Sequence, residues 1–134
     1  MNDTIRLRVL AKHNALRTDL ALGVVLNGQT DTYLRKANKM FQLRYSCNLE
    51  TTAIERAKQC SAISNRNPPN DVSENFRKYT QNLNRDRASA ATMTTQLWWS
   101  EITRRQTSIN QVLNIYYDHL GISSFAKVGS SLFL

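Results

Sequence analysis

Residues 65–71 constrain the fold of this chain more than any other segment. They read Asn-Arg-Asn-Pro-Pro-Asn-Asp, and proline and asparagine both favour turns over regular helix or strand. The segment therefore predicts a loop near the middle of the chain, with the regular elements on either side of it. Because 134 residues is close to the size of one ordinary domain, both halves are expected to share one core.

Three segments carry apolar residues at helical spacing. They are residues 4–21, 47–62 and 88–103, and in each the apolar positions recur mainly at three- or four-residue intervals. In the last segment Trp98 is expected to face the core. Trp99 points about 100° away from it on a helix and is expected to lie half-buried.

Two further segments are expected to be extended. Residues 40–45 nearly alternate apolar and polar side chains, and residues 126–133 carry apolar side chains without helical period. Alternation over a short stretch is typical of a strand, so each segment predicts one strand.

The chain is basic, with 18 Lys and Arg against 10 Asp and Glu and a formal net charge of +8. A positive surface attracts polyanions. The cations are scattered in pairs such as Arg35 with Lys36 and Arg104 with Arg105, and no run of five or more occurs. This pattern favours a solvated positive face over a nucleic-acid site, so a nucleic-acid-binding domain is the weakest hypothesis and no nucleic-acid partner is expected.

Several protein classes lack their usual signatures in this sequence. No apolar run reaches the roughly 18–20 residues of a membrane span, and no phosphate-binding glycine loop, nucleophile elbow or zinc-binding helix motif is present. No signal peptide is recognised, because Asp3 stands where a signal is basic and no apolar stretch follows. A cytosolic chain and a chain without its leader both fit this absence.

The chain has two cysteines, Cys47 and Cys60. If both lie on the second helix, a rise of about 1.5 Å per residue separates them by about 19 Å. A disulfide needs Cα atoms within about 7 Å, so the two are not expected to bond to each other. They are expected to be buried thiols that pack as small apolar side chains, or thiols that lack their disulfide partners.

Several fragments of the sequence occur in an order that resembles one known family. They are His13-Asn14-Ala15-Leu16-Arg17, Tyr45-Ser46-Cys47-Asn48-Leu49-Glu50, Ser73-Glu74-Asn75-Phe76, Trp98-Trp99-Ser100-Glu101-Ile102 and His119-Leu120-Gly121. These fragments resemble the motifs of the CAP superfamily, which includes cysteine-rich secretory proteins, insect venom antigens and plant pathogenesis-related proteins. The similarity is greatest to the nematode activation-associated or venom-allergen-like secreted proteins.

The resemblance implies a fold and a location. The implied fold is of the α+β class, a three-layer α-β-α sandwich with a central antiparallel sheet. Residues 1–134 would form one CAP domain that is incomplete at its C-terminus. The family resemblance also implies an extracellular, secreted protein.

The resemblance further implies a cleft in which two histidines and two glutamates can hold a divalent metal, commonly zinc. Glu74, Glu101 and His119 match three of these four residues, whereas Ser64 stands where the family has its other histidine. A serine hydroxyl is a poor zinc ligand. The incomplete set predicts no required cofactor and at most weak or vestigial zinc binding, and His13 is expected to be structural.

The leading functional hypothesis is a non-enzymatic binding domain. The resemblance implies a sterol, a fatty acid or a host protein as partner, the last in modulation of host immunity. The alternative is a metal-assisted hydrolase, in which Glu74 or Glu101 acts as general base and His119 as metal ligand or acid. The loss of a ligand at Ser64 makes catalysis the weaker interpretation.

Overall fold

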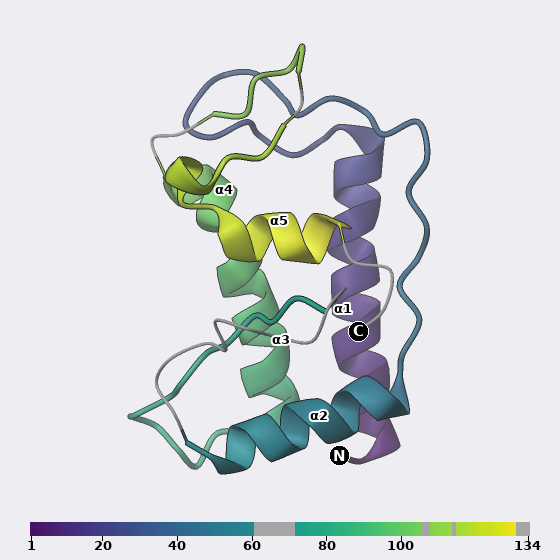
Figure 1. Cartoon of the computed structure of the whole chain (residues 1–134), viewed down its shortest axis with the longest axis vertical. Helices are drawn as coiled ribbons and strands as arrows, with labels where there is room; N and C mark the ends of the chain where they lie inside the picture. The colour runs from purple at the N-terminus through teal and green to yellow at the C-terminus, as the bar shows by residue number, and fades with distance from the viewer. Residues whose placement is uncertain (61–71, 106–107, 114, 131–134) are drawn as a thin grey trace.

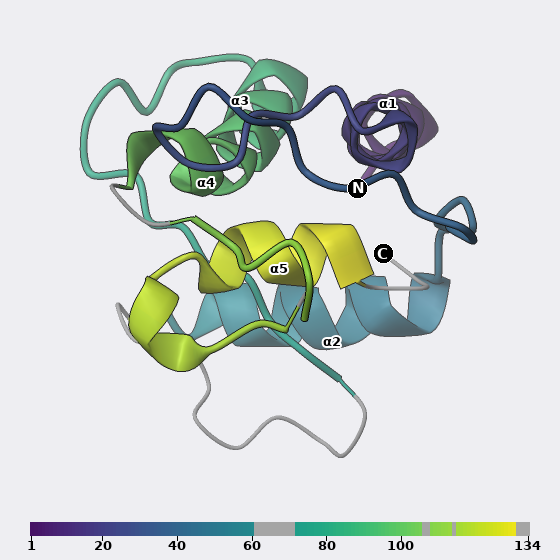
Figure 2. The ribbon, with the colours of Figure 1, turned by 90° about the horizontal axis from the view of Figure 1, so that it is seen from above.

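The computed structural model describes residues 1–60, 72–105, 108–113 and 115–130. The helices in these ranges are α1 (Asp3–Leu22), α2 (Cys47–Lys58), α3 (Arg87–Trp99), α4 (Glu101–Arg104), the 3₁₀ helix η1 (Asp118–Leu120) and α5 (Ser123–Ser130). Helices α1 and α3 stand side by side in one layer, and α5 and α2 cross them in a second layer (Figures 1 and 2). None of the described helices is long and apolar enough to cross a membrane.

Local sequence signals explain where the three long helices begin. The side chains of Asn2, Ser46 and Asp86 accept hydrogen bonds from backbone N–H groups in the first turns of α1, α2 and α3. Such caps satisfy donors that have no partner inside the helix. The helices predicted over 4–21 and 88–103 are therefore confirmed, although the second is divided at Ser100. The helix predicted over 47–62 is confirmed as far as Lys58; Gln59 and Cys60 follow its end, and residues 61–62 lie outside the described ranges.

Glycine is required where α1 ends. Gly23 has a φ of 71°, in the left-handed region that favours glycine. A Cβ atom at this position would also lie 2.9 Å from the Lys36 side chain and 3.1 Å from the Leu34 carbonyl oxygen. The residue thus stops the helix and lets residues 34–36 pass close beside it.

The apolar core joins α1, α3, α4 and α5. Its buried members are Leu16, Val25, Leu34, Trp99, Ile102, Leu120, Ile122, Phe125 and Val128. The rings of Trp99 and Phe125 are 4.9 Å apart, and Trp99 is only 6% exposed. Trp98 packs against this core but is only partly buried, so the relative burial predicted for the two tryptophans was wrong.

The predicted α-β-α sandwich is wrong for the part of the chain that the structure describes. The regular elements there are all helices, and no β-strand or central sheet is present. Leu26 and Tyr33 form an isolated antiparallel bridge. Of the strand predicted over 126–133, residues 126–130 belong to α5, and residues 131–133 lie outside the described ranges. The predicted loop over 65–71 lies outside them too.

Two distant side chains explain why α5 is helical. The Glu101 carboxylate accepts hydrogen bonds from the backbone N–H groups of Ser124 and Phe125, at 2.8 and 3.1 Å. At the other end, the Arg17 guanidinium donates to the carbonyl oxygens of Val128 and Gly129. These bonds satisfy groups that a helix terminus leaves without partners.

Residues 40–45 also form no strand in the structure, where Arg44 alone takes part in an isolated β-bridge. The side-chain amide of Asn14 accepts a hydrogen bond from the Leu43 N–H at 2.7 Å and donates one to the Leu43 carbonyl at 3.2 Å. At Leu43, the Asn14 side chain of α1 therefore makes the backbone hydrogen bonds that a neighbouring strand would make in a sheet. The strand predicted over residues 40–45 was wrong.

Candidate functional site

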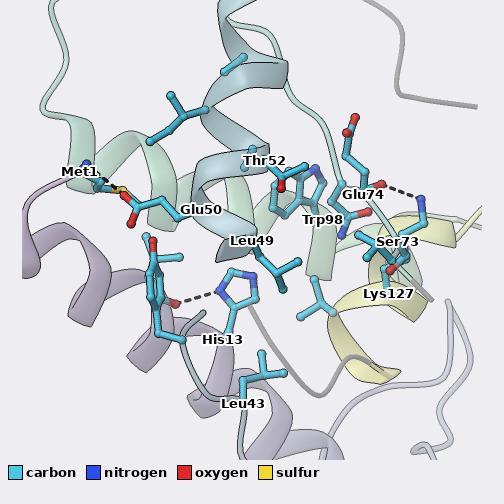
Figure 3. Close-up of a pocket in the computed structure, with 18 residues that line it drawn as sticks. Met1, His13, Leu43, Leu49, Glu50, Thr52, Ser73, Glu74, Trp98 and Lys127 are labelled. Carbon is cyan, nitrogen blue, oxygen red and sulfur yellow. Dashed lines mark hydrogen bonds and ion pairs between the residues drawn. The ribbon is translucent and has the colours of Figure 1, made fainter. Parts of the chain in front are cut away.

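A cavity of about 450 Å³ lies between α1, α2, residues 72–75, α3 and α5 (Figure 3). Its volume falls within the range of small-molecule sites. Most of its wall is formed by apolar side chains, including Val9, Leu43, Leu49, Ala53, Ile54, Ala57, Val72, Trp98 and Val128. We refer to this space as the α1–α2 cavity.

The periodicity of α2 creates one wall of the α1–α2 cavity. Leu49, Ala53 and Ala57 recur every four residues, so they share one face of the helix. Two of the three are alanines, whose small side chains leave space in front of the helix. Trp98 brings its ring to the cavity from α3 (Figure 3), which explains why it is not fully buried in the core.

His13 forms part of the opposite wall. It is 3% exposed, and its Nδ1 atom lies 2.8 Å from the carbonyl oxygen of Val9 (Figure 3). Burial lowers the pKa of His13 below its ordinary value of 6.5, and the positive charge of Arg17 lowers it further. The ring is therefore neutral near pH 7, and its Nδ1 donates the proton to Val9.

This lowered pKa gives a testable pH dependence. Below pH 6.5 the unfolded chain protonates His13 while the folded chain resists protonation, so the free energy of unfolding is expected to fall as the pH drops through this window. His13→Gln removes the titrating ring and should flatten the slope. Urea unfolding between about pH 7.5 and 5.5 measures how the free energy of unfolding changes with pH. His119→Gln is the control for the loss of a histidine. If His13→Gln shows the same pH dependence as the native chain, His13 is not the group responsible.

Ion pairs occupy the two carboxylates that line the α1–α2 cavity. The Glu50 carboxylate lies 2.9 Å from Arg6 Nε and 3.0 Å from the N-terminal amino group. The hydrogen bond from Arg6 is the largest cause of the lowered pKa of Glu50. Farther along, Glu74 Oε1 lies 3.8 Å from Arg56 Nε, and the Glu74 carbonyl accepts a hydrogen bond from Lys127.

The three metal-ligand candidates occupy different surroundings. Glu74 lines the α1–α2 cavity and pairs with Arg56, whereas Glu101 caps the N-terminus of α5. His119 is exposed in η1, where its ring stacks on Tyr117 with 5.5 Å between centroids. The fourth position, Ser64, lies outside the described residues.

In this structure, the side chains of Glu74, Glu101 and His119 do not form a preorganised zinc site. Within the described ranges, no group of three or more His, Cys, Asp and Glu side chains is arranged to hold a metal ion. One carboxylate is engaged by an arginine and another by helix N–H groups. The zinc site of Glu74, Glu101 and His119 therefore stays a prediction.

The two cysteines differ from the prediction of buried thiols. Cys47 and Cys60 are both free and exposed. Cys47 is the first residue of α2, whereas Cys60 lies beyond the last residue of that helix, with a φ of 49°. Cys60 therefore lies outside the helix, and the condition under which the separation of the two cysteines was estimated does not hold.

The sequence predicted a structural role for His13 but did not reveal the α1–α2 cavity. The four-residue repeat of Leu49, Ala53 and Ala57 supported only the prediction of a helix, although it is the signal that could have indicated a helix face of small residues. Leu43 and Trp98 come from other parts of the chain. Only the packing of α2 across α1 and α3 brings these side chains to one space.

Comparison with known protein families identifies the class to which this chain belongs. The model of the cysteine-rich secretory protein family, CAP, matches residues 10–129, and the chain belongs to this family. Among curated proteins, the chain is similar to Ancylostoma secreted protein from Ancylostoma caninum, with 33% identity over 106 residues. The match covers 76% of this chain and 24% of that protein, so the chain spans about a quarter of the length of this relative.

Solved structures of nematode venom allergen-like proteins have a similar fold. Na-ASP-1 matches with a TM-score of 0.84 and 25% identity, over 96% of this chain and 33% of its own. NaASP2, in a crystal structure with Zn²⁺, matches with a TM-score of 0.83 and 27% identity, over 99% of this chain and 70% of its own. The predicted family and its nematode branch are confirmed.

Proposed function

We propose that this chain is a non-catalytic binding domain that holds an elongated apolar molecule, such as a fatty acid or a sterol, in the α1–α2 cavity. The observation that carries the proposal is the apolar wall of this cavity of about 450 Å³. Binding there would remove the apolar side chains of both partners from water, which stabilises a complex by about 25 cal/mol for each Å² buried. Two carboxylates, those of Glu50 and Glu74, line the same space, and each is paired with an arginine.

The state of the polar groups favours binding over catalysis. A general base needs a carboxylate free to take a proton, and an enzyme of the hydrolase type predicted above needs a metal-bound water. Glu50 and Glu74 already pair with arginines, and Glu101 caps a helix.

The location and further partners of the chain also belong to this proposal. The relatives are secreted nematode proteins, which supports an extracellular location for this chain. A host protein as partner and a role in modulating host immunity follow from the family resemblance, and both stay predictions.

Filling the α1–α2 cavity tests the proposed function. In Ala53→Trp a large ring replaces a methyl group that lines the cavity, so the affinity for a fluorescent fatty acid or a fluorescent sterol is expected to fall at least about tenfold, equivalent to about 1.4 kcal/mol. Thr51→Trp is the matched control, because Thr51 is exposed on α2 and does not line the cavity. Equal binding by both variants would contradict this site, and a chain that binds neither probe would contradict lipid binding.

For zinc we propose only weak binding. With Glu74 and Glu101 engaged as described, a modest excess of zinc is expected to raise the melting temperature by less than about 2 °C, because a ligand near its Kd stabilises a protein by well under 1 kcal/mol. Differential scanning fluorimetry with and without a chelator measures this shift. A rise of several degrees that is lost in His119→Ala would show a real metal site.

A further inference from the structure

We propose that one end of the molecule docks on an anionic lipid bilayer through an exposed apolar surface, which we call the loop patch. Its side chains lie on two loops and are Val24, Leu26, Tyr33, Val112, Leu113, Ile115, Tyr116 and Tyr117. Their exposed fractions range from 37% for Tyr116 to 84% for Val112. Contiguous apolar surface of this kind marks sites that meet another protein or a membrane.

Hydrogen bonds hold the two loops together at the end of the molecule farthest from α2 (Figure 1). The buried side chain of Asn27 accepts from the Ile109 N–H at 2.7 Å and donates to the Ile109 carbonyl at 2.9 Å. The Arg35 N–H donates to the Gln111 side chain at 2.7 Å. The bonds place the two loops side by side, so their exposed apolar side chains lie at the same end of the molecule.

The backbone prevents these side chains from turning inward. Val25 and Leu34 are buried in the core, at 7% and 5% exposure, so their neighbours Val24 and Tyr33 project outward. In the second loop, Asn110 accepts hydrogen bonds from the N–H groups of Val112 and Leu113 at 2.9 and 3.1 Å. This turn holds two aliphatic residues at its tip.

The charges around the loop patch indicate what it meets. Arg35, Lys36, Arg104 and Arg105 are exposed beside it, and none of them forms an ion pair with a residue in the described part of the chain. The same segments carry only two acids, Asp31 and Asp118, so the net charge beside the loop patch is positive. Each cation near an anionic membrane surface contributes about 1 kcal/mol.

The composition of the loop patch agrees with a bilayer rather than with a second copy of the chain. Tyrosines combine an apolar ring with a polar tip and are enriched at the level of lipid headgroups. Aliphatic side chains at a turn tip can enter the acyl region while arginines contact phosphates. A symmetric dimer through this patch, by contrast, would gather the four cations of both copies around one interface, where like charges repel.

Vesicle sedimentation of the whole chain tests the proposal. Binding to vesicles of phosphatidylcholine mixed with phosphatidylserine is expected to exceed binding to phosphatidylcholine alone and to weaken as salt is added. Leu113→Asp should reduce the binding at least about tenfold, and Arg35→Gln with Arg104→Gln should reduce it in the mixed vesicles. Because these side chains are exposed, the variants are expected to keep the helical circular dichroism spectrum of the native chain.

Leu83→Asp is the matched control, since Leu83 is 72% exposed outside the loop patch, with Arg85 close in sequence. Ala53→Trp should sediment like the native chain, which separates this proposal from lipid binding in the α1–α2 cavity. Failure of the native chain to sediment, or equal loss in Leu83→Asp and Leu113→Asp, would overturn the proposal. A concentration-dependent dimer that Leu113→Asp abolishes would overturn it in favour of self-association.

Discussion

Replacing Trp99 with alanine is expected to lower the free energy of unfolding by about 3–5 kcal/mol, the usual cost of deleting a buried aromatic side chain. Trp99 is 6% exposed and packs on Phe125, with 4.9 Å between the ring centroids. Its removal would leave a void where α3 meets α5. Urea unfolding followed by far-ultraviolet circular dichroism measures the change.

The neighbouring tryptophan is the control. Trp98 is only partly buried and lines the α1–α2 cavity, so Trp98→Ala should cost about 1–2 kcal/mol, because less apolar surface is lost from the interior. An order in which Trp98→Ala is the more destabilising would contradict the core described above.

A loss of about 3 kcal/mol or more is expected when Arg17 is replaced by methionine. The Arg17 side chain is 4% exposed and donates to the carbonyl oxygens of Phe41, Val128 and Gly129. Methionine keeps most of the apolar stem but leaves these acceptors without their donor, and a buried unsatisfied polar group costs about 1–3 kcal/mol. Chemical unfolding again measures the effect.

The desolvation of Arg17 works against this loss of stability. Burial disfavours the charged guanidinium and lowers the pKa of Arg17, so removing the charge also removes a cost of folding. If this desolvation cost equalled the gain from the hydrogen bonds, Arg17→Met would be as stable as the native chain. That result would contradict the proposal that Arg17 stabilises the contact between α1 and α5. Arg8→Met controls for the substitution, since Arg8 is exposed on the same helix and should change stability by less than about 0.5 kcal/mol.

The first three helices could be predicted because their signals are local. Apolar spacing and the caps Asn2, Ser46 and Asp86 lie within or beside each helix. The family was recognisable for a related reason, since motifs such as His13-Asn14-x-x-Arg17 are short and ordered. The structure adds what that motif does: Asn14 binds the Leu43 backbone, and Arg17 joins α1 to α5.

The wrong predictions share one physical cause. The strand over 126–133 was predicted because its apolar residues show no helical period. In the structure Glu101 and Arg17, which lie 23 and 111 residues from their partners on α5, provide the caps of a helix over the described part of this segment. The burial of Trp98 and Trp99 depends on where α5 lies against α3. The α1–α2 cavity depends in the same way on α2 crossing α1.

The resemblance to the CAP family, the positions of α1, α2 and α3 and the positive charge could all be read from the amino-acid sequence, because motifs, periodicity, caps and charge are properties of neighbouring residues. The helical state of α5, the deeper burial of Trp99 and the apolar cavity beside α2 became evident in the folded chain alone. These outcomes depend on packing and hydrogen bonds between residues that are distant in the chain, and no local pattern records such contacts.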